Sequence, residues 1–167
     1  ALVTAFRQAG NSPLVDELDR VVTELEIQAA KHPHRRFQKG GLYPRSYISE
    51  TLGGSVVDFL PTHDGRVVCG CFTTDHNPEA PEVIIPGTGP VIEHTAELFC
   101  QQTSFIPVFL KRRPNEWEYV GDYRAARCTT DPAEIAAHHL GSVTPLAEIT
   151  RVIYLQDADM PLSSAVP

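Results

Sequence analysis

The sequence predicts an α+β domain in which an N-terminal helix precedes a mostly antiparallel, barrel-like sheet. Three observations favour this class. Apolar residues recur at helical spacing over residues 12–31, short β-rich segments occupy residues 53–156, and a second helical pattern starts near residue 132. The 167 residues are enough for one domain with a substantial core, and no boundary or internal repeat interrupts them. We therefore expect a single domain over residues 1–167.

The N-terminal helix has a start signal, a stop signal and an apolar face. Asn11 and Ser12 are capping residues, and Pro13 is favoured at the first helical position. The helix should end before Pro33, because proline interrupts a helix. We expect its apolar face to pack against the core of the domain. That face carries Leu14, Leu18, Val21, Val22, Leu25 and Ala29.

The β-rich region is expected to contain two main hairpins. Residues 55–60 and 66–73 flank an Asp-Gly turn signal at 64–65. Residues 106–110 and 117–123 flank a basic turn. The remaining elements are short: strands at 83–85 and 150–155, a strand or helix at 91–101, a helix at 132–139, and a loop at 32–47 rich in Gly and Pro.

The chain is acidic overall, yet its positive residues are concentrated in two segments. The formal net charge is −7, and ten of the 14 Lys and Arg residues lie in residues 31–45 and 111–127. Both segments also contain aromatic side chains. This distribution favours a localised site for a polyanion over non-specific coating of DNA. Ordinary solvated surface is the alternative reading of the same charges.

Two local patterns resemble a family of uncharacterised domains found in fungi. The first is residues 75–81 followed by Pro86–Gly89, and the second is residues 108–110 followed by Glu116–Tyr123. Together they lie within residues 75–127, about a third of the chain. This resemblance implies no particular function.

Residues 119–123, with the sequence Tyr-Val-Gly-Asp-Tyr, more loosely resemble a strand of the SRA (YDG) domains. Those domains are PUA-like barrels that read modified cytosine in DNA. Val120 stands where their motif has Asp, which is a departure from the pattern. The resemblance implies a PUA/SRA-like barrel that holds an extruded base between aromatic side chains while basic loops bind the phosphates.

We interpret the chain as a non-catalytic nucleic-acid-binding module that reads modified bases, with DNA favoured over RNA as the partner. Tyr43 and Tyr47 would offer stacking faces, and Asp58 would accept a hydrogen bond from a cytosine amino group. The positive side chains of both segments would bind phosphates. They are Arg35, Arg36, Lys39, Arg45, Lys111, Arg112 and Arg113.

Two other functions remain open. A small hydrolase or nuclease would use His63 with Asp64, or a cysteine with a histidine, but no nucleophile motif supports it. A protein-interaction domain would use the acidic N-terminal helix. We expect neither a cofactor nor a metal, because the Cys69-x-Cys71 spacing differs from that of zinc fingers.

The composition also bears on location. No apolar run approaches the length of a membrane-spanning helix, and no signal peptide is visible. Four cysteines in 167 residues do not make a disulfide-dense chain, so we expect them to be mostly reduced. These features predict an intracellular protein, nuclear or cytoplasmic, with no membrane partner.

Overall fold

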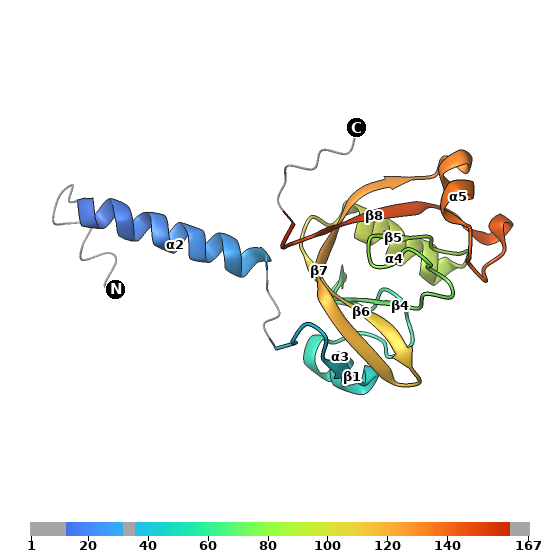
Figure 1. The fold of residues 1–167 in the computed structure, drawn as a ribbon, viewed down its shortest axis with the longest axis horizontal. Coiled ribbons are helices and arrows are strands. Elements are labelled where there is room, and N and C mark those ends of the chain that lie inside the picture. Colours follow the sequence, from blue (N-terminus) through green and yellow to red (C-terminus); the bar gives the residue numbers. More distant parts are fainter. Residues whose placement is uncertain (1–12, 32–35, 161–167) are drawn as a thin grey trace.

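The computed structural model describes residues 13–31 and 36–160, and these form an α+β fold (Figure 1). The predicted class is therefore confirmed. The helices are α2 (Pro13–Lys31), α3 (Arg45–Leu52), α4 (Pro90–Gln101) and α5 (Pro132–His138), with a 3-10 turn at Leu146–Glu148. The strands are β1 (Leu42–Tyr43), β2 (Thr62–His63), β3 (Arg66–Val67), β4 (Gly70–Phe72), β5 (Val83–Ile84), β6 (Ile106–Arg113), β7 (Glu116–Thr129) and β8 (Val152–Asp157).

A mixed sheet of six strands forms the body of the molecule. Its order is β4-β6-β7-β8-β5, and β1 pairs with the start of β7. Only β4 and β6 run parallel among the described pairs, so the sheet is mostly antiparallel, as predicted. It does not close into a barrel, since β4 and β5 remain its two edges over the described residues. The small β2–β3 hairpin stands apart from this sheet.

The long β6–β7 hairpin lies in the middle of the sheet. Asn115 turns the chain with a φ of 58°, a left-handed value that asparagine tolerates better than most residues. The sheet curves, and α4 lies within the curve (Figure 1). Ala96 and Phe99 of α4 pack there against Val108 and Leu110 of β6. This packing forms the larger core.

A second core lies on the other side of β6. Strand residues alternate between faces, so Phe109 points away from its neighbours Val108 and Leu110. It packs with Phe37, Ile48 of α3 and Trp117 of β7. The sheet is thus buried on both faces where β6 and β7 pair.

The segment 55–60 is not the strand that its apolar residues predicted. Val56 and Val57 are 50% and 81% exposed. Local side-chain bonds replace a strand ladder here, because the Ser55 hydroxyl accepts from the backbone N–H groups of Val57 and Asp58. Residues 62–63 pair with β3 instead.

Two further expectations about helices were wrong. The predicted loop at 32–47 contains the start of α3, which begins after Pro44. None of the residues of α2 is buried, and its predicted packing against the core does not occur. Figure 1 shows α2 extending away from the sheet. Within the described ranges, no helix is both long and apolar enough to span a membrane.

The cysteines fall into two pairs. A disulfide joins Cys100 at the end of α4 to Cys128 near the end of β7, contrary to the expected reduced state. Cys69 and Cys71 are free and buried.

Candidate nucleic-acid interface

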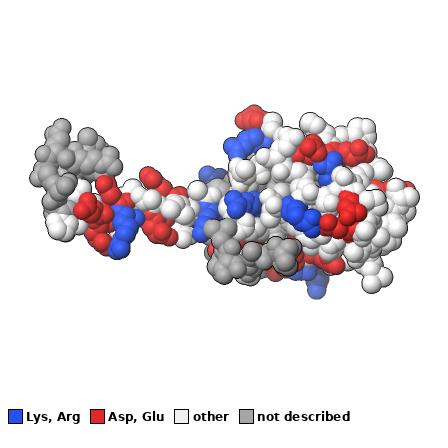
Figure 2. Space-filling model, turned by 90° about the horizontal axis from the view of Figure 1, so that it is seen from above, with Lys and Arg blue, Asp and Glu red and all other residues white. Residues whose placement is uncertain are grey.

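Several of the predicted phosphate-binding side chains already have partners in the protein. Positive and negative groups lie side by side over the face of the body in Figure 2. Arg112 forms an ion pair with Glu118, and Lys39 with Asp159 at 2.8 Å. The hydrogen bond to Asp159 raises the pKa of Lys39. Arg113 reaches Glu116 at 4.0 Å, and Arg35 lies outside the described residues.

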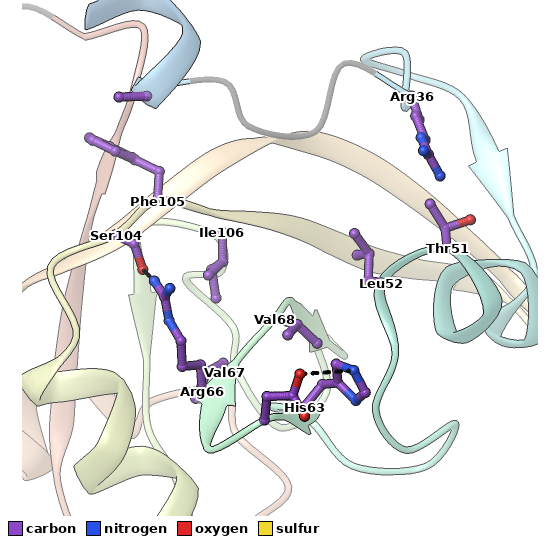
Figure 3. A pocket seen from close by; sticks show the side chains of 12 residues that line it. Arg36, Thr51, Leu52, His63, Arg66, Val67, Val68, Ser104, Phe105 and Ile106 are labelled. Atoms are coloured by element: carbon purple, nitrogen blue, oxygen red, sulfur yellow. Dashed lines mark hydrogen bonds and ion pairs between the residues drawn. The ribbon is translucent and has the colours of Figure 1, made fainter. Parts of the chain in front are cut away.

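Two arginines differ from this pattern and line one hollow. The hollow measures about 670 Å³ and lies between the C-terminal end of α3, the β2–β3 hairpin and the start of β6. Arg36 and Arg66 lie on opposite sides of it (Figure 3). Neither forms an ion pair with a carboxylate of the described residues, and Arg66 donates only to the Ser104 hydroxyl at 2.9 Å. We call this site the basic hollow.

Other side chains complete the wall of the basic hollow, and the carboxylate of Asp64 is one of them. Phe105 lines it, and the guanidinium of Arg124 lies 5.0 Å from the centre of that ring. His63 is also in the wall, with Nε2 at 3.5 Å from Asp64 Oδ2 (Figure 3). Guanidinium groups that keep free N–H donors bind phosphates through paired hydrogen bonds. The basic hollow is therefore suited to an anion.

A second cavity lies at the opposite end of β4 and β6. It measures about 610 Å³, and Arg45, Asp58 and Trp117 are among its lining residues. Arg45 is only 8% exposed and donates from Nη2 to the backbone oxygens of Ser55 and Asp58, each at 2.9 Å. Its guanidinium lies 5.1 Å from the centre of the Trp117 ring. We call this cavity the edge pocket.

The edge pocket combines hydrogen-bonding groups of both kinds with apolar walls. No residue of the described ranges accepts a hydrogen bond from Nε or Nη1 of Arg45, so these donors are available. The Asp58 carboxylate supplies an acceptor, and Lys111 adds a positive charge beside Trp117. Phe59 and Ile92 are part of the apolar wall. Such a pocket suits a planar ligand that carries both donors and acceptors.

Tyr43 and Tyr47, the predicted stacking residues, line neither cavity. Their rings stack on each other at 5.5 Å with an interplanar angle of 15°. Tyr43 also accepts a hydrogen bond from the Gln38 backbone N–H and packs edge-on against Phe37. The aromatic residues beside the two cavities are Trp117, Phe59 and Phe105 instead.

Sequence reasoning missed the two residues that define the cavities most clearly. Arg66 lies outside both basic segments, and only its place beside the Asp64-Gly65 turn hinted at an exposed site. Trp117 was predicted only as part of the strand at 117–123, and it is buried at 8% exposure while also lining the edge pocket. Three of the predicted site residues line the edge pocket: Arg45, Asp58 and Lys111.

This geometry gives little support to the hydrolase hypothesis. The side chains of His63 and Asp64 are 58% and 89% exposed, so neither lies on the floor of a cavity. The neighbouring Cys71 thiol and burial raise the pKa of Cys69 well above its usual value, which keeps it a thiol rather than a nucleophilic thiolate. In residues 13–31 and 36–160, no three potential ligands surround a possible metal position.

Comparison with known proteins yields one family. A family model described as a domain of unknown function (DUF6697) matches residues 42–140. This range contains most of the edge pocket lining, including Arg45, Asp58 and Trp117, and it excludes Arg36 and α2. No curated protein and no solved structure matches the chain.

Proposed function

The chain belongs to the DUF6697 family, and we propose that it is a nucleic-acid-binding module that reads modified bases. One observation carries the proposal. In a protein with a net charge of −7, two arginines without carboxylate partners among the described residues line the same hollow. An acidic surface offers many carboxylates, so cations left unpaired in one place favour an external anion.

The contrast with three other arginines supports this reading. Arg112 and Arg127 pair with carboxylates of neighbouring strands or helices, and Arg151 pairs with Glu97. A paired guanidinium must give up its partner before it binds phosphate, whereas Arg36 and Arg66 need not. Binding of phosphates to the latter two releases condensed counterions, which favours association and makes it sensitive to salt.

The edge pocket supports the base-reading part of the proposal. Asp58 would accept from the amino group of cytosine, and Arg45 would donate to its ring acceptors. The Trp117 ring lies against the Arg45 guanidinium and would hold it in place for this contact. A substituent on the base would contact the apolar wall at Ile92.

The spacing of the cavities is compatible with a single strand that occupies both. Ile106 lines the basic hollow and Lys111 lines the edge pocket, and both belong to β6. Five residues of a strand span about 16 Å. That distance corresponds to about five nucleotides at the rise of B-DNA.

Fluorescence anisotropy with labelled oligonucleotides tests the proposal. The probes are short duplexes and single strands that carry cytosine, 5-methylcytosine or 5-hydroxymethylcytosine. We expect the Arg36→Glu/Arg66→Glu variant to bind at least tenfold more weakly than the wild type. The matched control is Arg20→Glu/Arg113→Glu, which changes the net charge equally at exposed sites outside both cavities and should weaken binding less than threefold.

A second variant separates base reading from phosphate binding. Asp58→Asn replaces the carboxylate acceptor with an amide and leaves the basic hollow intact. We expect it to lose the preference among cytosine forms while affinity for an unmodified strand stays within about threefold. Equal binding of all probes by the wild type would contradict base reading, and wild-type binding unaffected by Arg36→Glu/Arg66→Glu would contradict the phosphate site.

A further inference from the structure

Helix α2 presents an apolar face that is exposed in the part of the chain that the structure describes. Leu14, Leu18, Val21 and Leu25 are 63%, 42%, 46% and 58% exposed. None of the 19 residues of the helix is buried. Most helices in proteins gain their stability by packing such a face, since isolated helices of this length are only marginally stable in water. A partner that covers the face would therefore stabilise α2.

The spacing of the apolar residues indicates what that partner is. Leu14, Leu18, Val21 and Leu25 are separated by four, three and four residues. This is the a/d pattern of a coiled coil, in which the seam of one helix faces the same seam of another. Leu18 and Leu25 occupy a positions, and Leu14, Val21 and Gln28 occupy d positions.

The charges beside the seam distinguish between two alignments of a second copy. The flanking g positions carry Glu17, Glu24 and Lys31, and the e positions carry Val15, Val22 and Ala29. In a parallel pair g faces e, so each glutamate lies beside an uncharged residue. In an antiparallel pair with these four layers matched, Glu17 would face Glu24 of the other copy twice. Like charges in contact are unfavourable, so the parallel alignment is preferred.

We propose that α2 pairs with α2 of a second copy of this chain as a parallel, two-stranded coiled coil. The remaining acids of the helix, Asp16, Asp19 and Glu26, lie away from the seam in this heptad assignment. Figure 2 shows acidic and basic side chains together over the helix. Gln28, whose Nε2 donates to Glu24 Oε1 of its own helix at 3.0 Å, lies opposite its own counterpart in the parallel pair. This inference is independent of nucleic-acid binding.

Pairing has a consequence for the rest of the molecule. Ala30, at the C-terminal end of α2, lines the basic hollow. A parallel pair brings the two C-terminal ends together, and with them the two hollows. Two linked sites bind one polyanion more tightly than either site alone, because the second contact is intramolecular.

The mass of the full chain in solution tests the pairing. Sedimentation equilibrium from 5 to 200 µM should show a species of twice 18.4 kDa at the upper concentrations. Leu18→Glu/Leu25→Glu places charges in the seam and should give a monomer. The matched control, Thr23→Glu/Ile27→Glu, adds the same charges off the seam and should remain a dimer. Near-ultraviolet circular dichroism of Trp117 checks that the sheet stays folded in each variant.

A cysteine cross-link tests the orientation separately. Gln28→Cys should oxidise to a covalent dimer within the parallel pair, because the two side chains face each other. In an antiparallel pair these residues lie at opposite ends and would not join. A monomeric wild type, a trimeric or larger species, or a dimer that survives Leu18→Glu/Leu25→Glu would overturn the proposal, as would failure of Gln28→Cys to cross-link.

Discussion

The hydroxyl of Tyr119 donates a hydrogen bond of 2.9 Å to Oδ1 of Asp122, and both residues lie on β7 inside the fold. Tyr119 is 6% exposed and Asp122 is 2% exposed. Burial, with the nearby Asp122 charge, raises the pKa of Tyr119, so the phenol remains a donor at neutral pH. The pair belongs to the Tyr-Val-Gly-Asp-Tyr segment that resembles the SRA strand. Here these two residues stabilise the sheet and line neither cavity.

Replacement of Tyr119 by Phe should therefore lower stability without altering binding. The change removes a donor from a buried carboxylate, and such losses cost about 1–3 kcal/mol. Urea unfolding, followed by the fluorescence of Trp117, measures the free energy of unfolding of each variant. Tyr47→Phe is the control, because Tyr47 is 41% exposed and its hydroxyl bonds to none of the described residues. Equal stability of the two variants would contradict this role for Tyr119.

Stability should also fall in acid through the ion pair between Glu134 and Arg127. The hydrogen bond from Arg127 lowers the pKa of Glu134 below its unfolded value of about 4.3. The stabilisation is therefore present above that value and is lost as the pH falls through the folded pKa. Glu134→Gln should be less stable than the wild type at pH 7, and the difference should shrink toward pH 3.

The urea midpoint at each half unit from pH 3 to pH 7 measures this dependence. Glu148→Gln is the matched control, since no Lys, Arg or His side chain of the described residues forms an ion pair with Glu148. Its midpoint should follow the wild-type curve. A constant difference between Glu134→Gln and the wild type over the whole range would contradict the assignment.

The disulfide between Cys100 and Cys128 should be a large contributor to stability. It closes a loop of 28 residues between α4 and β7. A disulfide that closes a loop of this size lowers the conformational entropy of the unfolded chain, which stabilises the folded state by about 3–4 kcal/mol. Cys100→Ala/Cys128→Ala should show this loss in urea unfolding, and dithiothreitol should destabilise the wild type but not the variant. If dithiothreitol leaves the stability of the wild type unchanged, Cys100 and Cys128 do not form a disulfide in solution.

Much of the fold followed from local patterns. The β6–β7 hairpin, α5 and the extent of α2 were predicted because alternation and capping residues are encoded within short segments, as in the Asp131 side chain that accepts from Ala133. The open sheet was not, because closure depends on which distant strands pair. The segment 55–60 was misread because its apolar residues suggested a strand, whereas Arg45 and Ser55 bind its backbone.

The candidate site was harder to predict than the fold. Charge density along the sequence identified the segments that contain Arg36 and Lys111, but it did not reveal which cations have partners. Nothing in the sequence marks Glu118 as the partner of Arg112, because that ion pair depends on the register of the β6–β7 hairpin. Arg66 and Arg36 come to line the same hollow only after folding. Sequence reasoning therefore located basic segments, and geometry selected the residues within them.

The salt dependence of binding tests the central claim most directly. The association constant of the wild type and of Arg36→Gln/Arg66→Gln for one labelled duplex is measured between 50 and 300 mM NaCl. Each lost phosphate contact reduces the slope of log K against log[salt] by about 0.9. We therefore expect the slope of the variant to be shallower by about 1.8. An unchanged slope, or a wild type that does not bind at 50 mM NaCl, would contradict the proposed interface.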